Sequence, residues 1–275
     1  MAPTTVFVLG MHRSGTSLLA RLLNFIGVDL GPSDRFDPPS PWNPTGYWEH
    51  TELRDINDDL LARLGGDWRR TPALPISAQD GDDLDDLRSR AAEIIERDFG
   101  AADTWGFKDP RTCLTLPFWE ELVPRMRCVL CVRHPLGVTD SLVHGSAPSY
   151  DGFDRAEGLA LWARYVAASV VGSAGHTRTV VWYDDVLRDP TGELSRLARE
   201  VGIRRGGLSA KAMSAAEAFV QPELRHHRPP SAKDDAELPT ATRNLLVALR
   251  APDADWASLN RLAERLLDLQ GAPTP

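Results

Sequence analysis

Two glycines five positions apart, Gly10 and Gly15, enclose a run of polar residues near the start of the chain. The residues before this run are apolar and rich in strand formers, and those after it repeat leucine at helical spacing. A strand, a glycine-rich turn and a helix in this order direct backbone N–H groups at one anion. A nucleoside triphosphate loop has lysine after its second glycine, but here that residue is Thr16 and the cation is Arg13. The pattern therefore predicts a phosphate-type site for a donor other than ATP, with a capped glycine turn as the structural alternative.

A second anion site is indicated further along the chain. Arg133 ends an apolar run over residues 127–133, and Ser141 lies eight positions later. A helix starting at Pro135 would place Ser141 about two turns into it. Both residues would then lie near the carboxyl edge of a parallel sheet, where open α/β folds bind ligands. Arginine and serine can hold a phosphate together at this place, although an isolated arginine at a strand end is more often a surface or capping residue.

Strand and helix patterns alternate along most of the chain. Strands are expected at residues 5–9, 104–108, 127–133 and 178–183. Helices are expected at residues 18–26, 53–64, 83–99, 114–122, 155–173, 191–201 and 260–269, and from Pro135 onward. This alternation predicts an α/β fold in which helices cover both faces of a mainly parallel sheet, giving three layers.

The length of the chain suits a single domain over residues 1–275. Two segments are expected to be loops. Residues 31–50 are rich in proline, and irregular segments of this length inside a domain often carry function. Residues 221–240 contain the most basic later cluster of an acidic chain and are expected to be flexible.

Composition limits the partners. A net charge of −8 and a pI near 5.4 argue against a broad nucleic-acid surface, so any bound anion must be held locally. The three cysteines, Cys113, Cys128 and Cys131, are expected to be buried thiols of a reducing compartment, which predicts a cytoplasmic protein. No paired His or Cys spacing indicates a metal site, and no apolar run is long enough to span a membrane. Assembly as a homodimer stays open.

The glycine loop, followed by an R-x7-S element at Arg133 and Ser141, resembles the nucleotide-binding signature of the sulfotransferase superfamily. The resemblance implies a P-loop fold and the donor 3′-phosphoadenosine 5′-phosphosulfate (PAPS), with adenosine 3′,5′-bisphosphate (PAP) as product and no metal. It also implies that Arg133 and Ser141 hold the 3′-phosphate. The loop residues that would cradle the 5′-phosphosulfate are His12, Arg13, Ser14, Gly15, Thr16 and Ser17.

Two further stretches are similar to elements of the same superfamily. Residues 105–111 read WGFKDPR, which resembles the strand-end Lys-Asp-Pro element of tyrosylprotein-type members. Tyr183 is followed by two aspartates and, at residues 189–190, by Asp-Pro, which resembles an element whose tyrosine lies beside the adenosine. In the later basic cluster, Arg225 and Arg228 could close over the 3′-phosphate, although a solvated loop fits them equally well.

Sulfuryl transfer needs an in-line approach, cations near the charge that develops, and a base for the acceptor hydroxyl. Arg13 is expected to support the leaving phosphate, and Lys108 the transferring group and the bridging oxygen. The histidine that gives many cytosolic members their base is absent, because Pro110 occupies its place. The base must therefore come from elsewhere in the chain.

Glu49 is the first choice for the base, because burial beside neighbouring aromatic rings could raise its pKa toward working pH. Its structural alternative is an acid at a helix start. Asp34 is the second choice, although its Gly-Pro-Ser-Asp setting is typical of a turn. His12 and His50 come third, since histidine has a suitable pKa but can equally be a satisfied structural residue.

The expected activity is sulfuryl transfer to a hydroxyl of a small molecule or saccharide. A P-loop kinase is the first alternative, and it would need a Gly-Lys-Ser/Thr loop and an acidic magnesium strand. A nonenzymatic nucleotide-binding protein is the second. The sequence does not identify the acceptor, although Trp42, Tyr47 and Trp48 could form an aromatic wall for it or could belong to the core.

Overall fold

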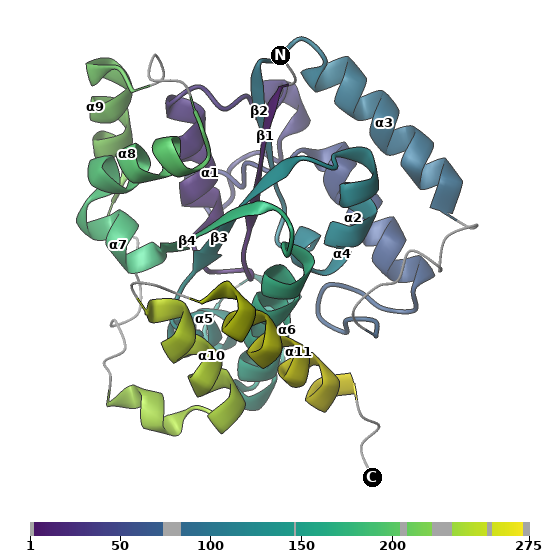
Figure 1. Ribbon diagram of the computed structural model, residues 1–275, viewed down its shortest axis with the longest axis vertical. Helices are drawn as coiled ribbons and strands as arrows, with labels where there is room; N and C mark the ends of the chain where they lie inside the picture. The colour runs from purple at the N-terminus through teal and green to yellow at the C-terminus, as the bar shows by residue number, and fades with distance from the viewer. Residues whose placement is uncertain are drawn as a thin grey trace.

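A parallel sheet lies at the centre of the computed structural model, which describes residues 3–73, 84–145, 147–203, 208–221, 233–251 and 255–271 (Figure 1). The described strands are β1 (Thr4–Leu9), β2 (Thr104–Lys108), β3 (Met126–Val132) and β4 (Thr177–Trp182). They are all parallel and are ordered β2-β1-β3-β4. The expected α/β fold with a mainly parallel sheet is confirmed.

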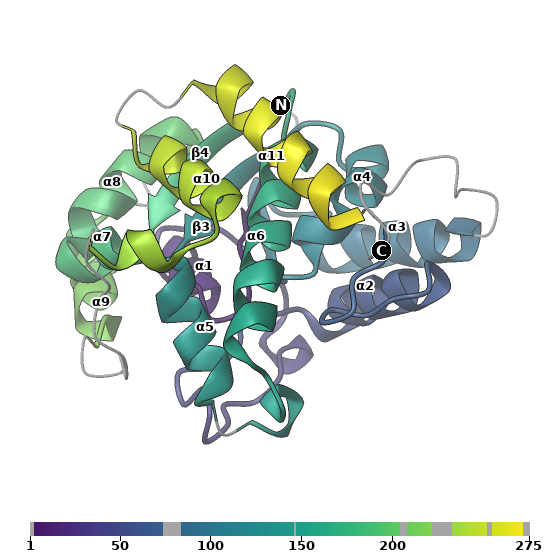
Figure 2. The same cartoon turned by 90° about the horizontal axis from the view of Figure 1, so that it is seen from below.

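The two faces of the sheet are buried by different helices. Because successive side chains of a strand point to opposite faces, Val6 and Val8 of β1 join one core cluster while Phe7 and Leu9 join the other. The first cluster is covered by α1 (Thr16–Phe25), α7 (Tyr183–Arg188), α8 (Pro190–Glu200) and α9 (Ala210–Phe219). The second is covered by α2 (Thr51–Arg63), α3 (Asp85–Phe99), α4 (Thr112–Leu122), α5 (Pro135–Val143), α6 (Arg155–Gly172), α10 (Thr240–Arg250) and α11 (Trp256–Gly271). Figures 1 and 2 show the resulting three layers.

Local chemistry sets where several helices begin. Pro135 opens α5 and Pro190 opens α8, as a residue without a backbone donor can do in a first turn. Asp154 caps α6 by accepting a hydrogen bond of 2.8 Å from the Glu157 N–H. The strand expected to reach Tyr183 ends one residue earlier, because Tyr183 starts the short helix α7. The helices α9 and α10 were not expected from the sequence pattern.

The strand order creates a crevice at the carboxyl edge of the sheet. The chain leaves β1 through α1 and later forms β2 on one side of β1, whereas β3 pairs on the other side. Ligands bind in open α/β sheets at such a change of direction. The segments that follow β1, β2, β3 and β4 all meet at this edge, and they carry the residues discussed next.

Candidate active site

A cleft of about 510 Å³ opens at the carboxyl edge of the sheet. Its walls come from the segment after each strand and from the Pro-rich segment 37–49. The sequence-predicted residues that line it are His12, Arg13, Gly15, Thr16, Ser17, Trp42, Tyr47, Glu49, Lys108, Arg133, Ser141 and Tyr183. Side chains from five distant parts of the chain therefore face one space.

The glycine loop after β1 has a backbone that few residues other than glycine accept. Gly15 has φ +90°, and a Cβ atom there would lie 2.3 Å from the ring of Tyr183. Arg13, which is not a glycine, also has a positive φ, of 67°. The loop thus lies directly against the Tyr183 ring. The positive φ of Arg13 points its side chain in a direction that a backbone with negative φ would not give.

Two buried polar atoms of the loop have no hydrogen-bond partner within the described residues. They are Ser14 Oγ and His12 Nε2. Buried polar atoms are almost always paired, so such exceptions at a loop of this kind fit a site that receives a polar ligand. His12 lines the cleft, whereas Ser14 is completely buried and is not among the lining residues, so His12 is the clearer case.

The two predicted anion-binding arginines lie together. Arg133 Nη1 donates a hydrogen bond of 3.0 Å to the carbonyl oxygen of Arg13, and Arg13 Nε donates one of 2.9 Å to Ser141 Oγ. The Arg133 guanidinium also lies over the Tyr183 ring, 4.9 Å from its centroid. The sequence assigned Arg13 to the first anion group, but its side chain here contacts Ser141, a member of the second.

Glu49 and Lys108 form a buried ion pair at the inner end of the cleft. Lys108 Nζ donates a hydrogen bond to Glu49 Oε1, and the two residues are 2% and 8% exposed. Burial raises the pKa of the Glu49 carboxyl, with Asp109 adding to the rise while Lys108 and Arg111 oppose it. A carboxylate with a raised pKa is a better proton acceptor than an exposed glutamate.

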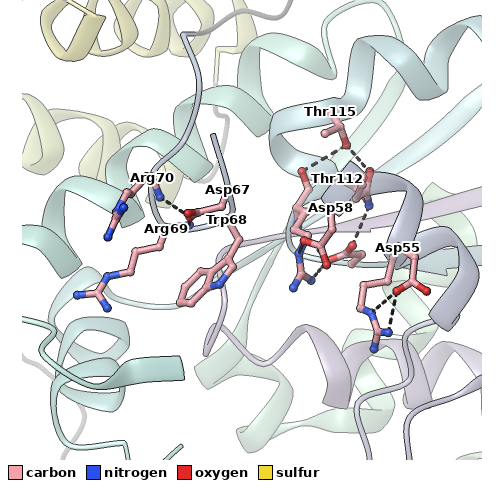
Figure 3. A network of polar contacts seen from close by, with 12 residues as sticks. Asp55, Asp58, Asp67, Trp68, Arg69, Arg70, Thr112 and Thr115 are labelled. Carbon is pink, nitrogen blue, oxygen red and sulfur yellow. Dashed lines mark hydrogen bonds and ion pairs between the residues drawn. The ribbon is translucent and has the colours of Figure 1, made fainter. Parts of the chain in front are cut away.

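A buried polar network fixes the segment that carries the lysine (Figure 3). Asn57 of α2 donates from Nδ2 to Asp109 Oδ2 at 2.8 Å and to Thr112 Oγ1 at 3.1 Å. Its Oδ1 accepts from Thr115 Oγ1 at 2.6 Å and from Trp119 Nε1 at 2.8 Å. Asn57 therefore uses its donors and acceptor to lock the start of α4, and with it the end of β2, against α2.

Arg111 extends this network to the cleft wall. Its Nη1 donates to Asp109 Oδ1 at 3.0 Å, and its Nε pairs with Asp58 Oδ1 at 2.5 Å. The nearby carboxylates raise the pKa of Arg111, so this residue stays a fixed cation. Burial, together with the positive charges of Arg111, Lys108 and Arg13, holds the pKa of His12 well below its usual value, so the ring in the loop is neutral at pH 7.

The other predicted candidates lie elsewhere. Asp34 is exposed in a short 3-10 helix (Ser33–Arg35) and is not among the residues that line the cleft. His50 is 1% exposed and does not line the cleft either; its Nδ1 accepts the Leu53 N–H, and its Nε2 pairs with Asp98 at 2.9 Å. His50 thus has the structural role of a helix cap. Arg225 and Arg228 lie outside the described residues.

Comparison with protein families decides which class this site belongs to. A model described as the sulfotransferase family matches residues 3–205, well over half of the chain. The chain belongs to the sulfotransferase family. The recognition made from the glycine loop and the R-x7-S element is confirmed.

Solved sulfotransferase structures resemble this family member in fold. Sulfotransferase STF9 from Mycobacterium avium has 14% identity and a TM-score of 0.50, with 98% of this chain and 77% of that chain covered. The sulfotransferase domain of the Synechococcus PCC 7002 olefin synthase has 15% identity and a TM-score of 0.44, with 99% and 96% covered. Retinol dehydratase, solved with androsterone and the inactive cofactor PAP, has 16% identity and a TM-score of 0.41, with 100% and 82% covered. No curated protein matches the chain.

Two aromatic residues of this sulfotransferase site were missed in the sequence. Trp68 follows α2 on a turn in which Asp67 Oδ1 accepts the N–H groups of Arg69 and Arg70, each at 2.7 Å (Figure 3). Its ring lies 4.7 Å from the ring of His12, measured between centroids. Tyr150 is the second, and both line the cleft. Their sequence neighbourhoods carry no motif, and the only available signal was an aromatic residue near turn formers.

Two further features are absent from the described residues. No group of three or more His, Cys, Asp or Glu side chains is placed so that it could hold a metal ion. None of the described helices combines the length and the apolar character that crossing a membrane requires.

Proposed function

We propose that this sulfotransferase uses PAPS as its donor and transfers the sulfuryl group to a hydroxyl of a small molecule or saccharide. The observation that carries the proposal is the hydrogen-bonded group of Arg13, Arg133 and Ser141, which shares one cleft with the Lys108–Glu49 pair. A donor with phosphates at two positions needs two anion contacts within reach of one transfer site. This cleft offers that combination.

The residues present fit such a donor. The unpaired Nε2 of His12 and the loop around Gly15 line the cleft and suit the 5′ end, and Arg133 with Ser141 suits the 3′-phosphate. Tyr183, which lies against both the loop and Arg133, offers its ring to the adenosine. When bound, the donor supplies a sulfuryl group attached to a phosphate leaving group.

Glu49 and Lys108 have complementary roles in this proposal. Glu49 takes the proton of the acceptor hydroxyl, for which its burial and raised pKa suit it. Once Glu49 is protonated its charge is lost, and the three donors of Lys108 can turn to the oxygen that becomes anionic. Asp34 is a weaker candidate for the base because it lies exposed and away from the cleft lining.

The acceptor side of the cleft combines rings with paired charges. Tyr47, Trp68 and Tyr150 supply aromatic surface, and the ion pair between Arg54 and Asp37 supplies polar groups. This mixture suits a hydroxylated small molecule or saccharide. The free cysteines are buried, which suits a reducing compartment, and we place the protein in the cytoplasm as part of the same proposal.

Calorimetric titration of the protein with PAP and with ATP–Mg²⁺ tests the donor. We expect PAP to bind at least tenfold more tightly, and preference for ATP–Mg²⁺ would favour a kinase instead. Turnover of labelled PAPS across a panel of hydroxylated acceptors then tests the chemistry, and binding without turnover of any acceptor would indicate a nonenzymatic nucleotide-binding protein.

The variants Glu49→Gln and Asp34→Asn test which residue is the base. Normal turnover by Glu49→Gln with loss of turnover in Asp34→Asn would reverse our assignment.

A further inference from the structure

Arg21 of α1 is a half-buried cation held mainly by aromatic rings. Its guanidinium carbon lies 4.2 Å from the centroid of the Phe25 ring and 4.4 Å from that of the Trp48 ring. Nη1 donates to Asn24 Oδ1 at 2.5 Å, but Nε is buried without a hydrogen-bond partner. Among the described residues no carboxylate forms an ion pair with Arg21. An arginine in this setting contributes through its contact with the rings.

Trp48, one of those two rings, has an unusual backbone. Its φ is 58°, in the left-handed region that bulky residues rarely adopt. Such conformations persist only where surrounding contacts enforce them, and they gather at functional sites. Here Trp48 Nε1 donates to the Thr45 carbonyl at 2.9 Å, and its ring contacts Phe36 and Arg21. Arg21 is the only charged residue among these contacts.

The position of Trp48 matters because Glu49 follows it. On the other side of Glu49, His50 is fixed by its hydrogen bond with Asp98 and by capping α2. The backbone of Glu49 is therefore held at both ends, and its side chain is directed at Lys108. Arg21 does not line the cleft, so any effect it has on the reaction must pass through Trp48.

We propose that Arg21 is a positioning residue that holds Trp48 in its left-handed conformation and so keeps Glu49 against Lys108. The inference rests on the proposed function only for the role of Glu49 as base. Arg21 lies on α1, which begins directly after the glycine loop. Its contact with Trp48 therefore also connects the donor loop to the base. The sequence shows no such connection, since Arg21 and Glu49 belong to no common motif.

The first test compares crystal structures of the wild type and Arg21→Met. Methionine keeps much of the side-chain length but lacks the charge. We expect φ of residue 48 to become negative and Glu49 to move out of hydrogen-bonding distance of Lys108. An unchanged Glu49–Lys108 contact in Arg21→Met would overturn the proposal. This readout needs no turnover, so it stands even if PAPS proves not to be the donor.

The second test measures kcat, the KM for each substrate and the Kd of PAP. For Arg21→Met we expect kcat to fall about tenfold, with PAP affinity within about twofold of wild type because the donor residues are untouched. Arg21→Lys should recover part of the loss, since lysine keeps the charge but not the planar stacking. In a Glu49→Gln background Arg21→Met should cost nothing further. An equal loss in both backgrounds, or no loss in either, would overturn the proposal.

Arg178→Met is the matched control. Arg178 lies 4.0 Å from the centroid of the Trp256 ring and does not line the cleft. Its replacement should lower the melting temperature while leaving kcat unchanged. If Arg178→Met lowers kcat as much as Arg21→Met does, the effect of Arg21 is a general loss of stability and the proposal is wrong. Absence of both PAP binding and wild-type turnover would instead count against the proposed function, with the crystal structures still deciding the role of Arg21.

Discussion

Arg133 Nη1 donates a hydrogen bond of 3.0 Å to the carbonyl oxygen of Arg13. This contact joins the end of β3 to the loop after β1, across the point where the strand order changes direction. Both guanidinium groups consequently face the same cleft. One ligand with two phosphates can bind both arginines only if they lie on the same side of the protein. The contact between Arg133 and Arg13 meets this condition.

Arg133→Ala is expected to weaken PAP binding by about 10- to 100-fold, because a buried charged hydrogen-bond donor to a phosphate is lost. Arg133→Lys should fall in between, since lysine keeps the charge without the forked donors. Calorimetric titration with PAP measures both. Arg155→Ala is the control, because Arg155 forms an exposed ion pair with Glu237 and does not line the cleft. Equal affinities for the wild type and Arg133→Ala would contradict the assignment of the second anion site.

Gly15→Ala is expected to destabilise the fold by about 1 to 3 kcal/mol beyond the strain of a positive φ, because its Cβ would overlap the Tyr183 ring. Gly27→Ala isolates the strain, since Gly27 has φ +99° and nothing lies within 4 Å of its added Cβ. Urea denaturation of the two variants gives the difference in free energy of unfolding. Equal destabilisation would show that the loop can move away from Tyr183 at no cost.

The fold could be predicted well because the strands are short apolar runs bounded by turn formers. That the main candidate site residues would line one cleft could also be predicted, for a geometric reason. Arg13, Arg133 and Tyr183 each follow a strand and Lys108 ends one, and the carboxyl ends of parallel strands meet at one edge of a sheet. Recognising the strand ends in the sequence was therefore enough to predict that these four side chains lie close together.

Contacts made by irregular segments could not be predicted in this way. The Glu49–Lys108 pair joins residues 59 positions apart, and Glu49 follows Trp48, whose left-handed backbone no local pattern indicates. The contact of Arg13 with Ser141 likewise depends on the unusual φ of Arg13. The sequence singled out Glu49 because of its aromatic neighbours, but its partner is set by tertiary packing.

The pH dependence of kcat should report the ionisation of Glu49. A base works in its ionised form, so kcat rises as pH rises through the pKa of Glu49. Because burial raises that pKa, the acid limb should lie at higher pH than the range of an exposed glutamate. Glu49→Gln should lose this limb and lower kcat by about 10²- to 10⁴-fold.

Steady-state kinetics at saturating donor and acceptor between about pH 4.5 and pH 9 make the measurement. Asp34→Asn is the control, because Asp34 is exposed and outside the cleft lining, and its acid limb should match that of the wild type. An acid limb that persists in Glu49→Gln would assign the base to another residue.

Replacement of Asn57 should show how much the polar network beneath the cleft contributes to stability. Asn57 is completely buried and takes part in four hydrogen bonds, so Asn57→Ala leaves several buried groups unpaired and should cost on the order of 3 kcal/mol. Asn57→Asp keeps the shape but sets a second carboxylate beside the buried Asp109. Burial and the like charge raise the pKa of the new group in the folded state, so its destabilising effect grows as pH rises above the pKa that it has in the unfolded chain.

Urea denaturation at pH 5 and pH 8 separates the two effects. Asn57→Asp should be less stable relative to wild type at pH 8 than at pH 5, whereas the deficit of Asn57→Ala should be the same at both. Asn260→Asp is the matched control, because the Oδ1 of Asn260 accepts from Arg178 at 3.1 Å and an aspartate there keeps that contact. If Asn57→Asp and Asn260→Asp respond to pH alike, the network around Asn57 does not bring a new carboxylate into conflict with Asp109.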